Sequence, residues 1–333
     1  MALASSDPHL TIALNDTDQV RDLVSGAVQV NGVQLTCLLL EVEEIFYRFS
    51  RHREWELSEL SLGKYCALRA RGDESLVGLP VFLSRAFRHS GIFVRADGPV
   101  DEPGRLAGGR IGFPEWTVTA TVYQRALLAH EFGIDLTGVQ WVQGGVNSPG
   151  RVETLPVGLP DGVHVTVETD RSLNDLLIAG ELDAVVVPRP PRAFTDGSGR
   201  IVQLFSDPQT VELDYFHRTG IFPIMHLAVV RRDVVDRHPW LPANLTTAFT
   251  EAKDRSVARL MDYTASHVPL PWPAERIRQA RTMLGGDPWP YGLEPNRTTL
   301  QAFCTYAYEQ RLCERRLDVE ELFPASVLDT FEV

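Results

Sequence analysis

Short apolar runs alternate with longer amphipathic stretches along most of the chain. Runs of about four to eight residues rich in Val, Ile and Leu are typical of strands, and the stretches between them have the length of helices. The predicted strands cover residues 10–14, 33–40, 55–60, 110–113, 139–142, 163–167, 184–187, 201–205 and 224–230. The predicted helices cover 42–51, 61–71, 117–132, 172–182, 211–218 and 241–261, with two more after Pro273 and Pro295. Strands that alternate with helices predict an α/β protein with largely parallel sheets.

Two segments rich in Pro and Gly interrupt this series, at residues 97–104 and 188–191. Such segments are typical of loops and hinges. A chain of 333 residues is also long for a single hydrophobic core. We therefore expect two lobes: residues 1–96 and 196–333 form the first, which is discontinuous, and residues 97–195 form the second.

The charge balance limits the partners. Lys and Arg number 32 and Asp and Glu number 44, a net charge of −12, which argues against nucleic acid and against an anionic membrane. No stretch approaches the ~18 apolar residues needed to cross a bilayer, and residues 1–7 lack the features of an export signal. The four cysteines show neither a CxxC pair nor a metal-ligand spacing, which indicates free thiols. We expect a cytoplasmic protein.

Cofactor motifs are missing from the sequence. There is no GxGxxG after the first strand, no P-loop, no HExxH and no closely spaced pair of histidines. The two lysines, Lys64 and Lys253, do not lie in a recognisable pyridoxal-phosphate motif. We therefore expect no cofactor and no metal motif, and a metal assembled from distant residues stays open.

Six stretches carry a family resemblance. They are Glu59–Tyr65 (ELSLGKY), Phe87–Ser90 (FRHS), Gly112–Ala120 (GFPEWTVTA), Gly180–Ala184 (GELDA), Arg218–His226 (RTGIFPIMH) and Tyr291–Arg297 (YGLEPNR). In residues and order, from about Leu10 to about Phe323, the chain resembles the 4,5-dihydroxyphthalate decarboxylases. The resemblance implies a two-lobed type II periplasmic-binding-protein-like fold with a ligand cleft between the lobes.

The resemblance also implies a carboxy-lyase: a non-oxidative, cofactor-free decarboxylase of an aromatic, dihydroxyphthalate-like acid. Loss of carbon dioxide from a benzene ring leaves a poorly stabilised aryl carbanion, so the enzyme gains by protonating the ring carbon first. A hydroxyl group para to that carbon supplies the electron density. Such a site needs cations, a proton donor and a proton acceptor.

His226 and His89 are the candidate proton donors, because imidazole exchanges a proton near neutral pH and both lie in family-like stretches. Glu59 is the candidate group that accepts a proton from a phenol or orients a histidine. The structural alternative for each histidine is a hydrogen-bonded core residue.

Candidate substrate-binding residues follow from donor chemistry and position. Arg88 presents a planar guanidinium that fits a carboxylate, and its alternative is a surface ion pair. Ser61, Thr117 and Thr119 stand at predicted helix starts, where hydroxyl and backbone N–H groups bind an anion or cap the helix. Arg189 follows a strand end, the usual ligand side of an open α/β sheet, although a solvated hinge arginine is the alternative. The full predicted set is Arg88, Arg218, Ser61, Thr117, Thr119, Arg189 and, as aromatic lining, Tyr65 and Trp116.

Two other functions fit the same sequence. One is a protein of this fold that only captures a small anion, and the other is a related lyase or tailoring enzyme with a different carboxylate substrate. Lys64 and His217 depart from the small polar and the basic residue that we expect in the family at these positions, which leaves the substrate open. In each case the partner is a small-molecule carboxylate, and a homo-oligomer stays open.

Overall fold

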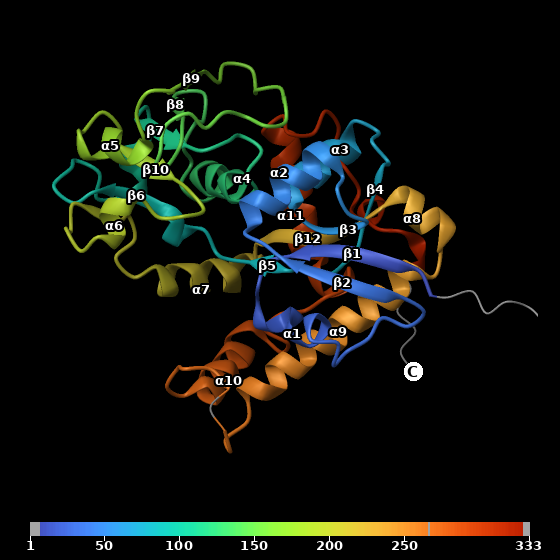
Figure 1. The fold of residues 1–333 in the computed structure, drawn as a ribbon. Coiled ribbons are helices and arrows are strands. Elements are labelled where there is room, and N and C mark those ends of the chain that lie inside the picture. The colour runs from blue at the N-terminus through green and yellow to red at the C-terminus, as the bar shows by residue number, and fades with distance from the viewer. Residues whose placement is uncertain (1–6, 266, 329–333) are drawn as a thin grey trace, which may run out of the picture.

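The predicted apolar runs form the strands of two separate sheets. The computed structural model describes residues 7–265 and 267–328, which build two α/β lobes (Figure 1). Sheet A has the order β2-β1-β3-β12-β4, with β5 also paired to β12: β1 His9–Leu14, β2 Gln34–Leu39, β3 Leu57–Ser61, β4 Leu76–Gly78, β5 Ser84–Arg85 and β12 Ile224–Arg231. Sheet B has the order β11-β6-β10-β7-β8-β9: β6 Ile92–Arg95, β7 Arg110–Phe113, β8 Gln140–Gln143, β9 Val165–Val167, β10 Ala184–Val186 and β11 Ile201–Gln203.

The helices lie largely where amphipathic stretches predict them. They are α1 Arg21–Val24, α2 Val42–His52, α3 Leu62–Ala70, α4 Thr119–Ala126, α5 Leu173–Ile178, α6 Arg192–Thr195, α7 Pro208–Thr219, α8 Arg232–Arg237, α9 Leu241–Leu260, α10 Pro273–Leu284 and α11 Arg297–Glu309. The α4 segment continues as a wider π-type turn to Glu131 and ends before Gly133, whose φ of +66° suits glycine. Among the described residues, no helix is long and apolar enough to cross a membrane.

The lobe boundaries differ from those expected. β6 pairs with β10 in the middle of sheet B, and β11 pairs with β6. The boundaries predicted at 96/97 and 195/196 therefore fall inside the span of sheet B, because the Pro/Gly-rich segment at 97–104 is a turn within the second lobe. The chain crosses between the lobes after β5 and again after β11, so the first lobe is still discontinuous.

Both sheets contain parallel strands with apolar side chains on both faces. All five residues of β3 and all three of β10 are buried. In sheet A, β1 runs parallel to β2 and β3, whereas β12 runs antiparallel to β3. Parallel strands place their carboxyl ends at one edge of a sheet, and the loops from these edges meet between the lobes. The site described next lies there.

Candidate functional site

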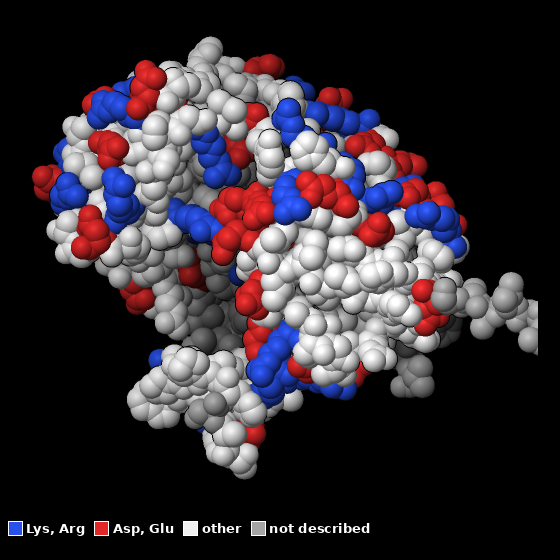
Figure 2. All heavy atoms as spheres, in the orientation of Figure 1, with Lys and Arg blue, Asp and Glu red and all other residues white. Residues whose placement is uncertain are grey.

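A cavity of about 640 Å³ lies between the two lobes. It is lined from the first lobe by α2, the start of α3 and the strands β5 and β12, and from the second lobe by the start of α4, the segment 145–151 and the residues after β10. Figure 2 shows Lys and Arg side chains next to Asp and Glu side chains along the line where the lobes meet. Of the predicted site residues, the cavity collects Ser61, Arg88, Thr119, Arg189 and His226.

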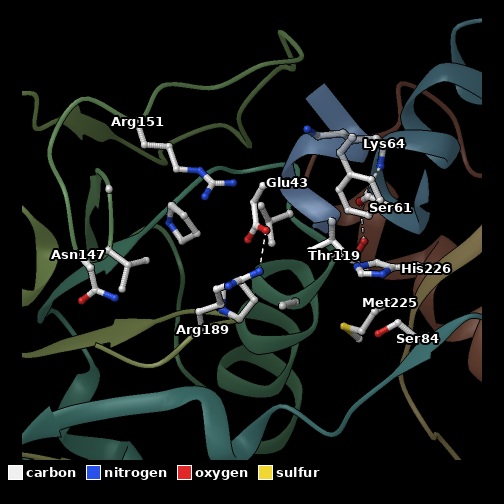
Figure 3. Close-up of a pocket in the computed structure, with 18 of the residues that line it drawn as sticks. Glu43, Ser61, Lys64, Ser84, Thr119, Asn147, Arg151, Arg189, Met225 and His226 are labelled. Atoms are coloured by element: carbon white, nitrogen blue, oxygen red, sulfur yellow. Dashed lines mark hydrogen bonds and ion pairs between the residues drawn. The ribbon is translucent and has the colours of Figure 1, made fainter. Parts of the chain in front are cut away.

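An irregularity in β12 directs two neighbouring side chains into this cavity. Ile224 pairs with Arg85 and His226 pairs with Ser84, so Met225 has no partner of its own across this pair of strands. A bulge of this kind changes which way a side chain points, and bulges recur next to active sites. Both Met225 and His226 therefore line the cavity, although successive residues of a regular strand point to opposite faces (Figure 3).

His226 is held by a buried carboxylate from the neighbouring strand. Glu59 lies opposite Ala228, diagonally across from His226 on the same face of the sheet, and its Oε1 lies 2.6 Å from Nδ1 of His226. The other carboxylate oxygen of Glu59 accepts a hydrogen bond from the backbone N–H of Asn15. The side chain of Glu59 is 3% exposed and that of His226 is 18% exposed. Because a carboxylate accepts hydrogen bonds, Nδ1 of His226 carries the proton that it donates to Glu59, and Nε2 lies on the cavity side.

Arg88 brings a positive charge to the same end of the cavity. Its Nε donates a hydrogen bond to Sδ of Met225 at 3.0 Å. Among the described residues no carboxylate lies within ion-pair distance of the guanidinium, and Glu212 acts on it only from farther away. Burial lowers the pKa of Arg88 to about 10, which leaves the group charged at neutral pH. An incoming carboxylate would find an unpaired cation here.

Two further cations share one buried carboxylate. Arg151 donates to Oε1 of Glu115 from Nε at 2.9 Å and from Nη2 at 2.7 Å. Nζ of Lys64, from the first lobe, lies 3.7 Å from Oε2 of Glu115 and donates to Oγ1 of Thr154 at 2.8 Å. Burial alone would raise the pKa of Glu115, but the charges of Lys64 and Arg151 hold it below its ordinary value. Glu115 thus connects both lobes behind the cavity wall.

Arg189 makes another connection between the lobes. Its Nη2 lies 2.7 Å from Oε2 of Glu43 and 3.4 Å from Oε2 of Glu41, at the start of α2 (Figure 3). Arg189 therefore lies at the cavity, as its position after β10 predicts, but it is an ion-pair partner and not a free solvated hinge residue.

Two of the hydroxyl residues at the cavity, Ser61 and Thr119, also bridge the lobes. Oγ of Ser61 accepts a hydrogen bond from the N–H of Lys64, as the N-cap of α3, and lies 2.9 Å from Oγ1 of Thr119. Oγ1 of Thr119 also accepts the N–H of Gly63 at 2.9 Å. Both the capping and the cavity-lining roles predicted for Ser61 are thus present in one residue.

Three predicted binding residues lie in the protein interior instead. Thr117 and Trp116 donate their backbone N–H groups to the carboxylate of Glu153, and Oγ1 of Thr117 does so as well. The indole of Trp116 also donates to a backbone carbonyl and stacks under the guanidinium of Arg125. The hydroxyl of Tyr65 donates to the carbonyl of Leu322, and burial raises its pKa. The expectation that these side chains line the cavity is wrong, because their donors are already satisfied within the fold.

Two predicted charged residues are also outside the cavity. His89 is buried between Phe205 and Tyr215, and burial lowers the pKa of its imidazole to about 4. It is therefore neutral near pH 7 and, away from the cavity, is not placed to protonate a ligand. Arg218 is half exposed and forms ion pairs with Asp214 and Glu131. Arg218 therefore forms surface ion pairs and does not line the cavity.

Several residues that line the cavity are not among the predicted site residues. Glu43, Lys64, Arg151, Asn147 and Ser84 all line the cavity (Figure 3). Two signals point to part of this group: Glu43 begins the helix that follows a parallel strand, and Arg151 and Asn147 lie in a long segment without regular structure, which in compact domains is often functional. Among the described residues, no group of three or more His, Cys, Asp or Glu side chains is arranged to hold a metal ion.

Comparison with solved structures defines the fold class. The periplasmic aliphatic sulphonate-binding protein SsuA of Escherichia coli superposes with a TM-score of 0.54 at 14% identity, covering 96% of this chain and 99% of that one. The desulfurization enzyme DSZB superposes with a TM-score of 0.52 at 16% identity, covering 96% of this chain and 97% of that one. The chain has the two-lobed α/β fold of the periplasmic binding proteins, as predicted.

Sequence relatives define the family within this fold. A 4,5-dihydroxyphthalate decarboxylase of Comamonas testosteroni is 39% identical over 325 residues, 97% of this chain and 98% of the relative. A second, of Pseudomonas putida, is 40% identical over 210 residues, 62% of this chain and 81% of that protein. No protein-family profile matches the chain. The chain belongs to the 4,5-dihydroxyphthalate decarboxylase family and is thus an enzyme of the carboxy-lyase class.

Proposed function

We propose that this protein removes carbon dioxide from a dihydroxyphthalate-like aromatic acid, without oxidation and without a cofactor, by protonating the ring carbon before the carbon–carbon bond breaks. The observation that carries the proposal is the His226–Glu59 pair at the wall of a cation-lined cavity. The substrate class is that in the names of both relatives.

The charges around the cavity suit an anion. Four cations line it, Lys64, Arg88, Arg151 and Arg189, and one carboxylate, Glu43, among the described residues. Lys64 and Arg151 share the carboxylate of Glu115, and Arg189 pairs with Glu41 and Glu43, so Arg88 is the lining cation left without a carboxylate partner in the described part of the chain. Local cations in a partly desolvated cleft attract an anionic substrate and hold it in place.

The proposed reaction assigns a task to each group. His226, in its protonated form, donates the Nε2 proton to the ring carbon that carries the departing carboxylate, while the para hydroxyl supplies electron density. The bond to the carboxylate then breaks, its electron pair restores the aromatic ring, and carbon dioxide leaves. His226 regains a proton from solvent, and Glu59 stabilises the imidazolium and orients its ring. Arg88 binds substrate carboxylate.

The direct test is incubation of the purified protein with 4,5-dihydroxyphthalate, following carbon dioxide release and the ultraviolet spectrum. His226→Asn should keep the fold and most of the binding and lower turnover by roughly 10²- to 10⁴-fold. His89→Asn is the matched control and should retain turnover, because His89 lies outside the cavity. In heavy water the product should carry deuterium at the vacated carbon.

Two results would contradict the proposal. Near-normal turnover in correctly folded His226→Asn would refute the imidazole as proton donor. Binding of the acid without any release of carbon dioxide would instead favour a protein that only captures small anions.

A further inference from the structure

One carboxylate stands among the cations of the cavity. Glu43, in the first turn of α2, is the single acidic side chain that lines it in the part of the chain that the structure describes. A carboxylate repels an anionic ligand, so its presence in an anion site needs a separate explanation. Its side chain is 45% exposed, so a ligand can reach it.

One oxygen of this carboxylate is held and the other is available. Oε2 of Glu43 lies 2.7 Å from Nη2 of Arg189, which comes from the second lobe. Oε1 accepts no hydrogen bond from any described residue. Arg189 therefore holds the carboxylate in place, and Oε1 is left as an acceptor at the cavity (Figure 3).

The position of Glu43 relative to the proton donor follows from the helix. Phe46, three residues later, lies on the same face of α2, and its ring packs edge-on against the imidazole of His226 with the centroids 4.8 Å apart. Glu43 thus stands one helical turn from the residue that touches His226, on the cavity side. A ring that lies against Phe46 with a carboxylated carbon at His226 directs a substituent on its far side toward Glu43.

We infer that Glu43 recognises a hydroxyl group of the substrate and so distinguishes hydroxylated aromatic diacids from plain ones. This inference rests on the proposed function. A phenolic hydroxyl donates to the carboxylate, and a hydrogen bond to a charged acceptor is strong. The same contact draws the hydroxyl proton away from its oxygen, which increases the electron density available to the ring carbon that His226 protonates. A diacid without hydroxyl groups leaves Oε1 unpaired and gains nothing from Glu43.

The test compares the binding of 4,5-dihydroxyphthalate with that of phthalate, which lacks the hydroxyl groups. Dissociation constants are measured by calorimetry in protein that carries His226→Asn, so that turnover does not consume the ligand. Glu43→Met, which keeps the side-chain length, should reduce the preference for the hydroxylated acid by roughly 10- to 100-fold. The affinity for phthalate should stay equal or rise, because a negative charge is lost.

Two matched variants separate recognition from cleft closure. Glu44→Met removes a neighbouring carboxylate that pairs with Arg48 and does not line the cavity, so the preference should not change. Arg189→Gln keeps the Glu43 carboxylate but removes the cation that holds it and a contact between the lobes, so it should weaken both ligands and lower the preference less than Glu43→Met does. An unchanged preference in Glu43→Met, or an equal loss for both acids, would overturn the inference.

The outcomes for the two proposals are separable. If the preference depends on Glu43 but no carbon dioxide is released by the wild-type protein, the decarboxylase proposal fails and the hydroxyl recognition stands. If carbon dioxide is released and Glu43→Met keeps the preference, the recognition by Glu43 fails alone.

Discussion

Replacing Glu59 by Gln tests whether the buried carboxylate acts through His226. The substitution keeps the shape of the side chain but removes the charge at 2.6 Å from Nδ1 of His226. A hydrogen bond to a charged group contributes about 1.5–3 kcal/mol, and without it the imidazole ring is no longer held in the orientation that proton donation needs. If this energy appears in the barrier, turnover falls by roughly 10- to 150-fold.

Glu59 acts as a positioning residue and does not line the cavity. The kcat of Glu59→Gln should therefore fall while KM changes little. The assay follows the ultraviolet spectrum of 4,5-dihydroxyphthalate from pH 5 to 9. A loss of folded protein, measured by circular dichroism, would instead indicate a purely structural role.

The chain offers a matched control for this variant. Oε2 of Glu56 accepts the backbone N–H of Thr11 at 2.9 Å, much as Glu59 accepts that of Asn15 at 3.0 Å, but Glu56 forms no recorded contact with His226. Glu56→Gln should thus keep its turnover. Equal losses in both variants, or a kcat of Glu59→Gln within about threefold of the wild type, would refute a role through His226.

Three more predictions follow from the same structure. Arg88→Lys should raise KM and weaken phthalate binding by roughly tenfold in calorimetry, because an ammonium does not reproduce the planar donor pair, and unchanged constants would reject the clamp. The low pKa of His89, about 4 in the fold against ~6.5 in the unfolded chain, means that its stability contribution is full above pH ~6.5 and is lost as the pH falls toward 4. Between pH ~6.5 and about 4, the free energy of unfolding of His89→Phe, measured in urea, should therefore fall by up to about 3 kcal/mol less than that of the wild type. His164→Gln, at an exposed site, should show the pH dependence of the wild type. Glu153→Gln, which weakens the bonds to Thr117, should speed hydrogen exchange of the 145–155 amides while the lobes stay folded, and unchanged exchange would contradict that role.

Residue pattern alone predicted most elements of this protein. Strands such as β10 and helices such as α2 and α9 depend on local periodicity and on turn residues. Both features can be identified from a short stretch of consecutive residues. Lobe membership was predicted less well. Strand β6 joins sheet B by pairing with β10, and β11 joins it by pairing with β6. The order of residues within a strand does not show which other strand it will pair with.

The candidate site shows the same division. His226, Arg88 and Ser61 lie in family-like stretches of the sequence, and the structure brings them to one cavity. His89 carries the same kind of signal but lies in the core, because burial depends on what packs against it, here Phe205 and Tyr215.

The sequence by itself determined the fold class, the family and the residue types available for acid–base chemistry. Only the tertiary structure decided which of them meet: Glu59 and His226 are 167 positions apart and touch through the register of β3 and β12. Glu43 had no sequence signal beyond the start of a helix, and it reaches the site because Arg189 of the other lobe lies across the cleft from it. Contacts between distant segments depend on strand pairing and lobe closure, which are collective properties of the fold and not of any local stretch of the chain.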